Sequence, residues 1–205
     1  MASVNEMIVR EYFEGLSFLV RQPRKYQVPA RSRRKLREEV DLLAVNPSAS
    51  KAPMPEMGIW TSADLKDVPR AIVGIRGWHT DRFSPAVLKQ SPEVYRFAGS
   101  DVVSRIQSEL GEGPVARILC LSELPASKSL QRRALAALKE NGIDGVLLYA
   151  TMLRELIDGI EIKKNYEKSD LLQLLRILKN YDLVKDSQLE FFKPRRRPRK
   201  KASGG

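Results

Sequence analysis

Four residues in the first eighty positions bear on whether this chain could act on phosphates. Glu6 lies in a short helical segment, Asp41 lies in the strand-like sequence EEVDLLAVNP, and Gly74 and Arg76 lie in RAIVGIRGW. Hydrolysis of a phosphodiester needs clustered carboxylates that hold a divalent metal, which polarises the phosphoryl oxygen and lowers the pKa of the attacking water. Glu6 and Asp41 supply two such carboxylates.

The third segment lacks the rest of that chemistry. Residues two apart in a strand point the same way, so Gly74 and Arg76 share one face. Gly74 has no side-chain oxygen, and Arg76 keeps its proton at any relevant pH and cannot act as a base. An arginine can still hold a phosphate through two hydrogen bonds. The pattern therefore predicts a site that holds phosphates rather than one that cuts between them.

The order of these motifs resembles the PD-(D/E)XK nuclease superfamily, especially its branch related to archaeal Holliday-junction resolvases and RecB-type nuclease domains. NEMIVREYFEGLSFLV is similar to the opening helix and first strand of that family, and EEVDLLAVNP is similar to its Asp-bearing strand. The resemblance implies that Glu6 and Asp41 are remnants of a catalytic site, and that Gly74 and Arg76 replace a Glu-x-Lys motif. It also implies no cofactor, or Mg²⁺ or Mn²⁺ on Glu6 and Asp41 if the chain is an active nuclease.

The fold implied is α/β with a restriction-endonuclease-like core over residues 1–150: a helix, a three-stranded meander, several helices, and a strand, helix, strand unit. Residues 151–192 are expected to form a helical extension that includes QLEFF as a short strand, and residues 193–205 a disordered basic tail. The first helix is expected to span residues 6–14 with Asn5 as its N-cap, and helices are expected after Ser84, Ser91 and at Asp101.

Each candidate catalytic residue has a structural alternative. Glu6 lies in the first turn of its helix, where an acidic side chain interacts favourably with the positive end of the helix dipole. Asp41 among apolar neighbours needs a partner, which is either a nearby arginine or a metal or substrate. If the chain still cleaves nucleic acid, the groups that replace the missing carboxylate and lysine are expected among Glu11, Lys25, Glu38, Glu39 and His79.

The net charge of +11 is concentrated in two runs. Residues 21–37 carry eight cations and no acid, and residues 193–201 carry seven cations. The two runs together hold +15, which leaves the rest of the chain at −4. Such a distribution favours a polyanion, DNA or RNA, as partner. The tail sequence also resembles a nuclear-localisation signal.

Trp78, His79 and Arg82 follow the third strand, where an aromatic ring can stack on a base and cations can contact phosphates. As alternatives, Trp78 packs in the core and His79 caps a loop. The candidate nucleic-acid-binding residues are Arg24, Lys25, Arg31, Arg33, Arg34, Lys35, Arg76, Trp78, His79, Arg82, Lys193, Arg195, Arg196, Arg197, Arg199, Lys200 and Lys201.

Two further features bear on partners and compartment. Leu171, Leu174, Leu175 and Leu178 repeat at helical spacing, so one face of residues 169–181 is expected to be packed, with a protein partner or a second copy as its possible contacts. The single cysteine, Cys120, lies in an apolar run and is expected to be a buried thiol. No apolar run is long enough for a membrane span, so an intracellular protein without membrane contact is expected, whether cytoplasmic, nucleoid-associated or nuclear.

Overall fold

The computed structural model describes residues 3–23, 40–49, 53–79, 82–111 and 113–184. The chain forms two compact units, Met1–Leu156 and Ile157–Gly205. The first unit holds the sheet and the candidate site. The predicted domain boundary at residue 150 stays a prediction, since compactness alone defines these units.

A five-stranded mixed sheet forms the centre of the first unit. Its strands are β1 (Leu19–Arg21), β2 (Leu42–Val45), β3 (Arg70–Arg76), β4 (Ala116–Leu121) and β5 (Gly145–Leu148), and they lie side by side in chain order. β1, β2 and β3 are antiparallel neighbours, whereas β3, β4 and β5 run parallel. The mixed α/β class, the meander and the parallel strand pair are thereby confirmed.

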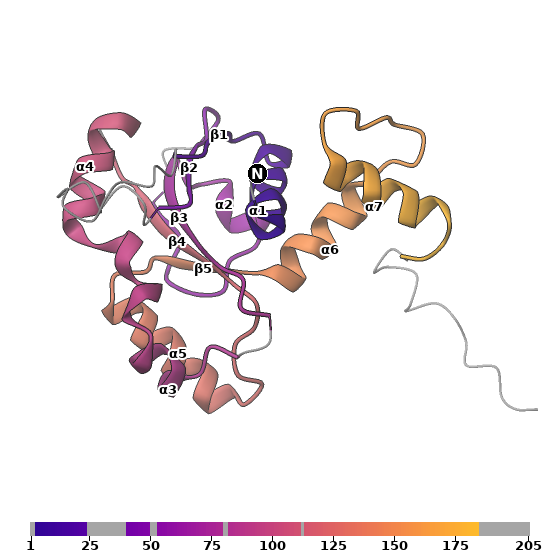
Figure 1. Ribbon diagram of the computed structural model, residues 1–205. Coiled ribbons are helices and arrows are strands. Elements are labelled where there is room, and N and C mark those ends of the chain that lie inside the picture. The colour runs from indigo at the N-terminus through magenta and orange to yellow at the C-terminus, as the bar shows by residue number, and fades with distance from the viewer. Residues whose placement is uncertain (1–2, 24–39, 50–52, 80–81, 112, 185–205) are drawn as a thin grey trace, which may run out of the picture. The chain divides into compact units, whose positions relative to one another are not determined.

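Seven α-helices lie in the described residues. They are α1 (Val4–Gly15), α2 (Ser62–Leu65), α3 (Pro85–Gln90), α4 (Ser100–Leu110), α5 (Lys128–Glu140), α6 (Tyr149–Gly159) and α7 (Asp170–Asn180), with single 3-10 turns η2 (Pro92–Val94) and η3 (Arg96–Ala98). In Figure 1, α1 lies on one side of the sheet and α3, α4 and α5 lie on the other. On the latter side Ile72, Leu119 and Val146 of the sheet pack with Phe97 and Leu138 in one core cluster.

Two helix predictions need correction. The N-cap of α1 is Ser3 and not Asn5, because Ser3 Oγ accepts the Glu6 N–H at 3.2 Å while Glu6 Oε2 accepts the Ser3 N–H at 3.0 Å. This is a capping box, which satisfies two otherwise unpaired backbone donors. The predicted helix after Ser91 is only the turn η2. The helix after Ser84 and the helix α5 are confirmed.

The second unit contains α7. Leu171 and Leu175 are buried, but Leu174 is 51% exposed, so the predicted leucine stripe is wider than the face that packs. Lys179 Nζ donates to the carbonyl oxygens of Ile157 at 3.0 Å and Ile160 at 2.8 Å. The predicted QLEFF strand and the basic tail lie outside the described residues.

None of the helices in the described part of the chain is long and apolar enough to cross a membrane.

Candidate functional site

The antiparallel pairing of β2 and β3 brings Asp41 next to Arg76. Leu42 pairs with Val73 in this register, and the Asp41 N–H donates to the Val73 carbonyl at 3.1 Å. Asp41 therefore lies opposite Gly74 and diagonal to Arg76, and diagonal neighbours are within reach of a long side chain. Arg76 Nη1 lies 3.0 Å from Asp41 Oδ2.

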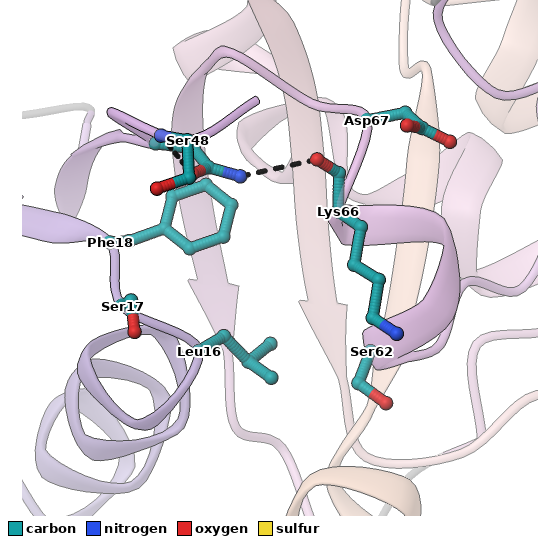
Figure 2. A pocket seen from close by; sticks show the side chains of 8 residues that line it. Leu16, Ser17, Phe18, Ser48, Ser62, Lys66 and Asp67 are labelled. Carbon is teal, nitrogen blue, oxygen red and sulfur yellow. Dashed lines mark hydrogen bonds between the residues drawn. The ribbon is translucent and has the colours of Figure 1, made fainter. Parts of the chain in front are cut away.

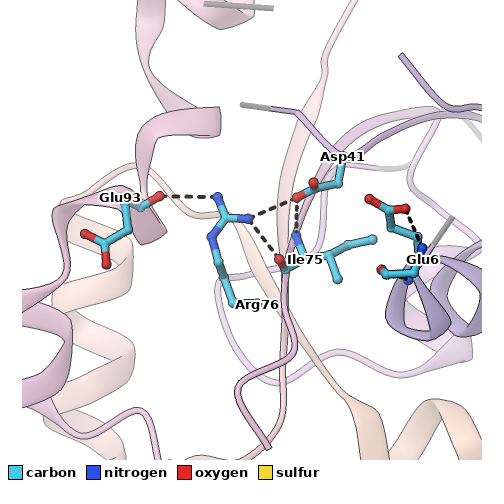
Figure 3. A network of polar contacts seen from close by, with 6 residues as sticks. Glu6, Asp41, Ile75, Arg76 and Glu93 are labelled. Carbon is cyan, nitrogen blue, oxygen red and sulfur yellow. Dashed lines mark hydrogen bonds and ion pairs between the residues drawn. The ribbon is translucent and has the colours of Figure 1, made fainter. Parts of the chain in front are cut away.

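Arg76 is enclosed by further acceptors, as Figure 3 shows. Its Nη1 also donates to its neighbour Ile75's carbonyl at 2.9 Å, and Nη2 donates to the Glu93 carbonyl at 3.3 Å. Its guanidinium lies 5.8 Å from the centre of the Phe97 ring, within range of a cation–π contact. The Asp41 carboxylate accepts a second hydrogen bond from the Ile75 N–H at 2.8 Å. The side chains of Arg76 and Asp41 are only 14% and 10% exposed.

Phe97 covers Gly74, where the resembling family carries a carboxylate. A Cβ atom at position 74 would lie 2.4 Å from Phe97 Cδ1, a distance that real Cβ atoms do not reach. The ring is fully buried. Position 74 therefore accepts no side chain while Phe97 keeps this place.

Glu6 is engaged on α1. Besides the capping box, its Oε2 accepts a hydrogen bond from Gln22 Nε2 at 3.0 Å, directly after β1. These contacts agree with the structural alternative for Glu6, in which it is a first-turn acid that stabilises its own helix. Of the two carboxylates predicted for a metal, Glu6 thus binds backbone and Gln22, and Asp41 binds Arg76 and Ile75.

The three predicted contact residues that follow β3, namely Trp78, His79 and Arg82, each contact another residue of the first unit. The Trp78 ring stacks on Phe83 with centroids 5.3 Å apart and is half-buried against the core. His79 is exposed, and its Nε2 lies 2.8 Å from Asn5 Oδ1. Arg82 forms an exposed ion pair with Glu123 at 3.1 Å. Their contacts with nucleic acid stay predictions.

The other predicted contact residues lie outside the described part of the chain. They are Arg24, Lys25, Arg31, Arg33, Arg34, Lys35, Lys193, Arg195, Arg196, Arg197, Arg199, Lys200 and Lys201, as are Glu38 and Glu39.

Sequence reasoning missed Tyr149, the first residue of α6, which lies where β5 ends. Its side chain is buried, and among the described residues its hydroxyl has no hydrogen-bond partner. Burial raises the pKa of this phenol, and electrostatic interactions with Cys120, Asp41 and Glu6 add to the effect. The hydroxyl therefore stays protonated. Only its place directly after a buried strand could have drawn attention to it.

Cys120 is fully buried in β4, as expected. Burial raises the pKa of its thiol, with a smaller contribution from Asp41 that Arg76 opposes. A thiol held in its protonated form is a poor nucleophile.

Two surface hollows lie at the other end of the sheet. One, of about 400 Å³, is lined by Leu16, Ser17, Phe18, Asn46, Ser48, Ser62, Lys66 and Asp67 (Figure 2). The other, of about 510 Å³, is lined by Met54, Pro55, Met57, Pro114, Val115, Arg117, Lys139, Gly142, Ile143 and Asp144. Asn46 Nδ2 closes one side of the first hollow by donating to the Lys66 carbonyl at 3.3 Å. In the second, Arg117 and Asp144 are already paired at 2.9 Å.

The described residues contain no group of three or more His, Cys, Asp and Glu side chains that could hold a metal ion. With Gly74 covered and Asp41 paired to a cation, the described residues of the candidate site do not fit a divalent metal. The chain was compared with protein-family models, curated proteins and solved structures, and none of them matches it.

Proposed function

We propose that this chain binds the phosphate backbone of DNA or RNA through a restriction-endonuclease-like core whose catalytic positions are degenerate. The observation that carries the proposal is the separation of charge: two runs with +15 on a body of −4. Such runs repel themselves unless a polyanion neutralises them, and nucleic acid is the polyanion with regularly spaced charges.

The order of elements supports the fold assignment. A helix precedes three antiparallel strands, helices follow, and β4, α5 and β5 form a parallel unit. This is the order expected from the resemblance. The candidate site lies where β3 ends, beside the start of β2.

The contacts of Asp41, Gly74 and Arg76 support binding without cleavage. An acid that neutralises a neighbouring arginine is not available as a metal ligand without breaking a buried pair. Arginine at position 76 cannot take a proton from water. Cleavage at this site would need both features to change.

The ends of the first cationic run connect it with the candidate site. Gln22, the second residue of the run, donates a hydrogen bond to Glu6. Val40 follows the run by three residues and is buried next to Asp41 in the sequence. Both ends of the run are thus joined to described residues of the site.

The test is a salt titration of binding to duplex DNA, a DNA junction, single-stranded DNA and RNA, each with and without Mg²⁺ or Mn²⁺. We expect binding that weakens steeply with salt and does not depend on the metal, without cleavage. Absence of salt-dependent binding to all four would refute the proposal. Metal-dependent cutting that Asp41→Asn abolishes in a folded protein would instead support an active, structure-selective nuclease with relocated catalytic residues.

One observation favours a second candidate function, that of an interaction subunit in a nucleic-acid or ribosomal complex. On α7 and directly after it, Leu174, Ile177 and Tyr181 recur at spacings of three and four residues, and all are exposed. Sedimentation at working concentration tests self-association through this face. A monomer at all concentrations would leave only a different protein as its partner.

A further inference from the structure

We propose that the exposed face of α5 is a third nucleic-acid-binding surface, in contact with the phosphate backbone. The inference rests on the proposed function and deepens it by placing a contact on a helix of the first unit that belongs to neither cationic run.

The charge of α5 differs from that of its neighbours. Lys128, Arg132, Arg133 and Lys139 stand against the single acid Glu140, a net charge of +3. Every other described helix carries a net charge between −2 and +1. The excess on α5 is therefore local, in a body that is acidic outside the two runs.

Three of the cations form a row. Lys128, Arg132 and Lys139 are separated by four and seven residues, which places them on one face of the helix over about 16 Å. All three are exposed. A different face of the helix carries the buried Ala134 and Leu138, which pack into the core cluster and fix the helix on the sheet. The row is thus held by a rigid element rather than by a loop.

These cations have no acidic partner in the described part of the chain. The ion pairs among the described residues join other side chains. Within the row, Arg132 Nε donates to the Lys128 carbonyl at 3.5 Å, which is long for a hydrogen bond. Ala136 lies between the cations and is exposed, so a backbone can approach closely there. A row of charges without counter-charges next to a small side chain fits a phosphate chain better than an acidic peptide, whose carboxylates are irregularly spaced.

The test uses the full chain with Lys128, Arg132 and Lys139 all changed to Ala. Alanine has the highest helix propensity, so α5 should form as before, which circular dichroism and a thermal melt verify. The matched control changes Lys163, Lys164 and Lys168, three exposed cations of the second unit, to Ala. Both variants lose the same charge.

We expect the slope of log K against log salt on duplex DNA to fall by about 2.7 in the α5 variant, since each phosphate contact contributes about 0.9. Affinity at about 0.1 M salt should fall by up to about 500-fold, because each contact is worth about eightfold between 1 M and 0.1 M salt. The control should leave the slope unchanged and should change the affinity by no more than about twofold.

Two results would overturn the inference while leaving the proposed function intact. One is wild-type binding that the folded α5 variant retains in full. The other is an equal loss in the α5 variant and the control, which would show a response to total charge rather than to this surface. If the wild-type chain binds no nucleic acid at any salt concentration, the proposed function itself fails and the inference with it.

Discussion

The pair of Asp41 and Arg76 should contribute measurably to the stability of the first unit. The perturbation is a double-mutant cycle with Asp41→Asn and Arg76→Met, which remove one charge each and keep most of the side-chain volume. Asparagine can still accept the Ile75 N–H, so Asp41→Asn mainly removes the ion pair. Each single change leaves a charge without its partner at a site where both side chains are nearly covered.

The magnitude follows from that burial. Removing one member of a buried pair costs about 3–5 kcal/mol, whereas removing both charges together is often nearly neutral. With about 3 kcal/mol for each single change and a similar or smaller cost for the double variant, the interaction energy in the cycle should be at least about 3 kcal/mol. At about 2 kcal/mol/M for urea, each single change lowers the unfolding midpoint by about 1.5 M.

The assay is urea unfolding followed by tryptophan fluorescence, since Trp60 and Trp78 both lie in the first unit. The exposed pair of Arg82 and Glu123 provides the control, because its side chains are 63% and 61% exposed and such pairs contribute about 0.5 kcal/mol. A cycle for Asp41 and Arg76 that is additive within about 0.5 kcal/mol would refute the reasoning. So would a gain in stability on Asp41→Asn, which is typical of a residue kept for function.

Four further results are expected. Gly74→Ala should lower the free energy of unfolding by about 1–3 kcal/mol in the same assay, since its Cβ meets the Phe97 ring, and an unchanged value would mean that the ring moves freely. Tyr149→Phe should raise it by about 1 kcal/mol by removing a buried hydroxyl without a described partner, whereas a loss of stability would reveal a hydrogen bond to that oxygen. Burial raises the pKa of Tyr149 and Tyr12 above the ordinary value of about 10, so the folded chain keeps protons that the unfolded chain releases. Below about pH 10 the free energy of unfolding should therefore not depend on these phenols, and above it each phenol should lower that free energy by about 1.4 kcal/mol per pH unit. Unfolding curves between about pH 8 and about pH 11 check this. The same slope of the free energy against pH in the wild-type chain and in Tyr149→Phe would contradict it. Ser3→Ala should cost about 1 kcal/mol through loss of the cap and increase amide exchange in the first turn of α1, and unchanged exchange there would argue against the capping box.

Local patterns were enough to predict most of the sheet. Buried strands such as β3 and β4 are apolar runs bounded by turn-forming residues, and α5 has a clear apolar stripe, so their positions follow from periodicity. The antiparallel hairpin also makes a partner for Asp41 on β3 foreseeable, because a register fixes which residues lie diagonally opposite.

The cover over the site could not be predicted in this way. Phe97 lies on the turn η3, more than twenty residues after Gly74, and nothing in its local sequence indicates which strand its ring meets. Tyr149 depends in the same way on the packing of distant elements. The cap of α1 was within reach, since Ser3 and Glu6 have the spacing of a capping box, but Asn5 directly precedes Glu6 and is an equally good N-cap by type.

The contact between Gly74 and Phe97 restricts the order in which this site can change by mutation. A carboxylate at position 74 would be harmful while the aromatic ring is in place, yet the same substitution could be tolerated once position 97 carries a small side chain. Changing Phe97 first opens a cavity, at about 3–5 kcal/mol for Phe→Ala. Substitutions at the two positions should therefore be non-additive: a library that varies them one at a time would find both intolerant, and only paired substitution would show which acidic variants the fold accepts.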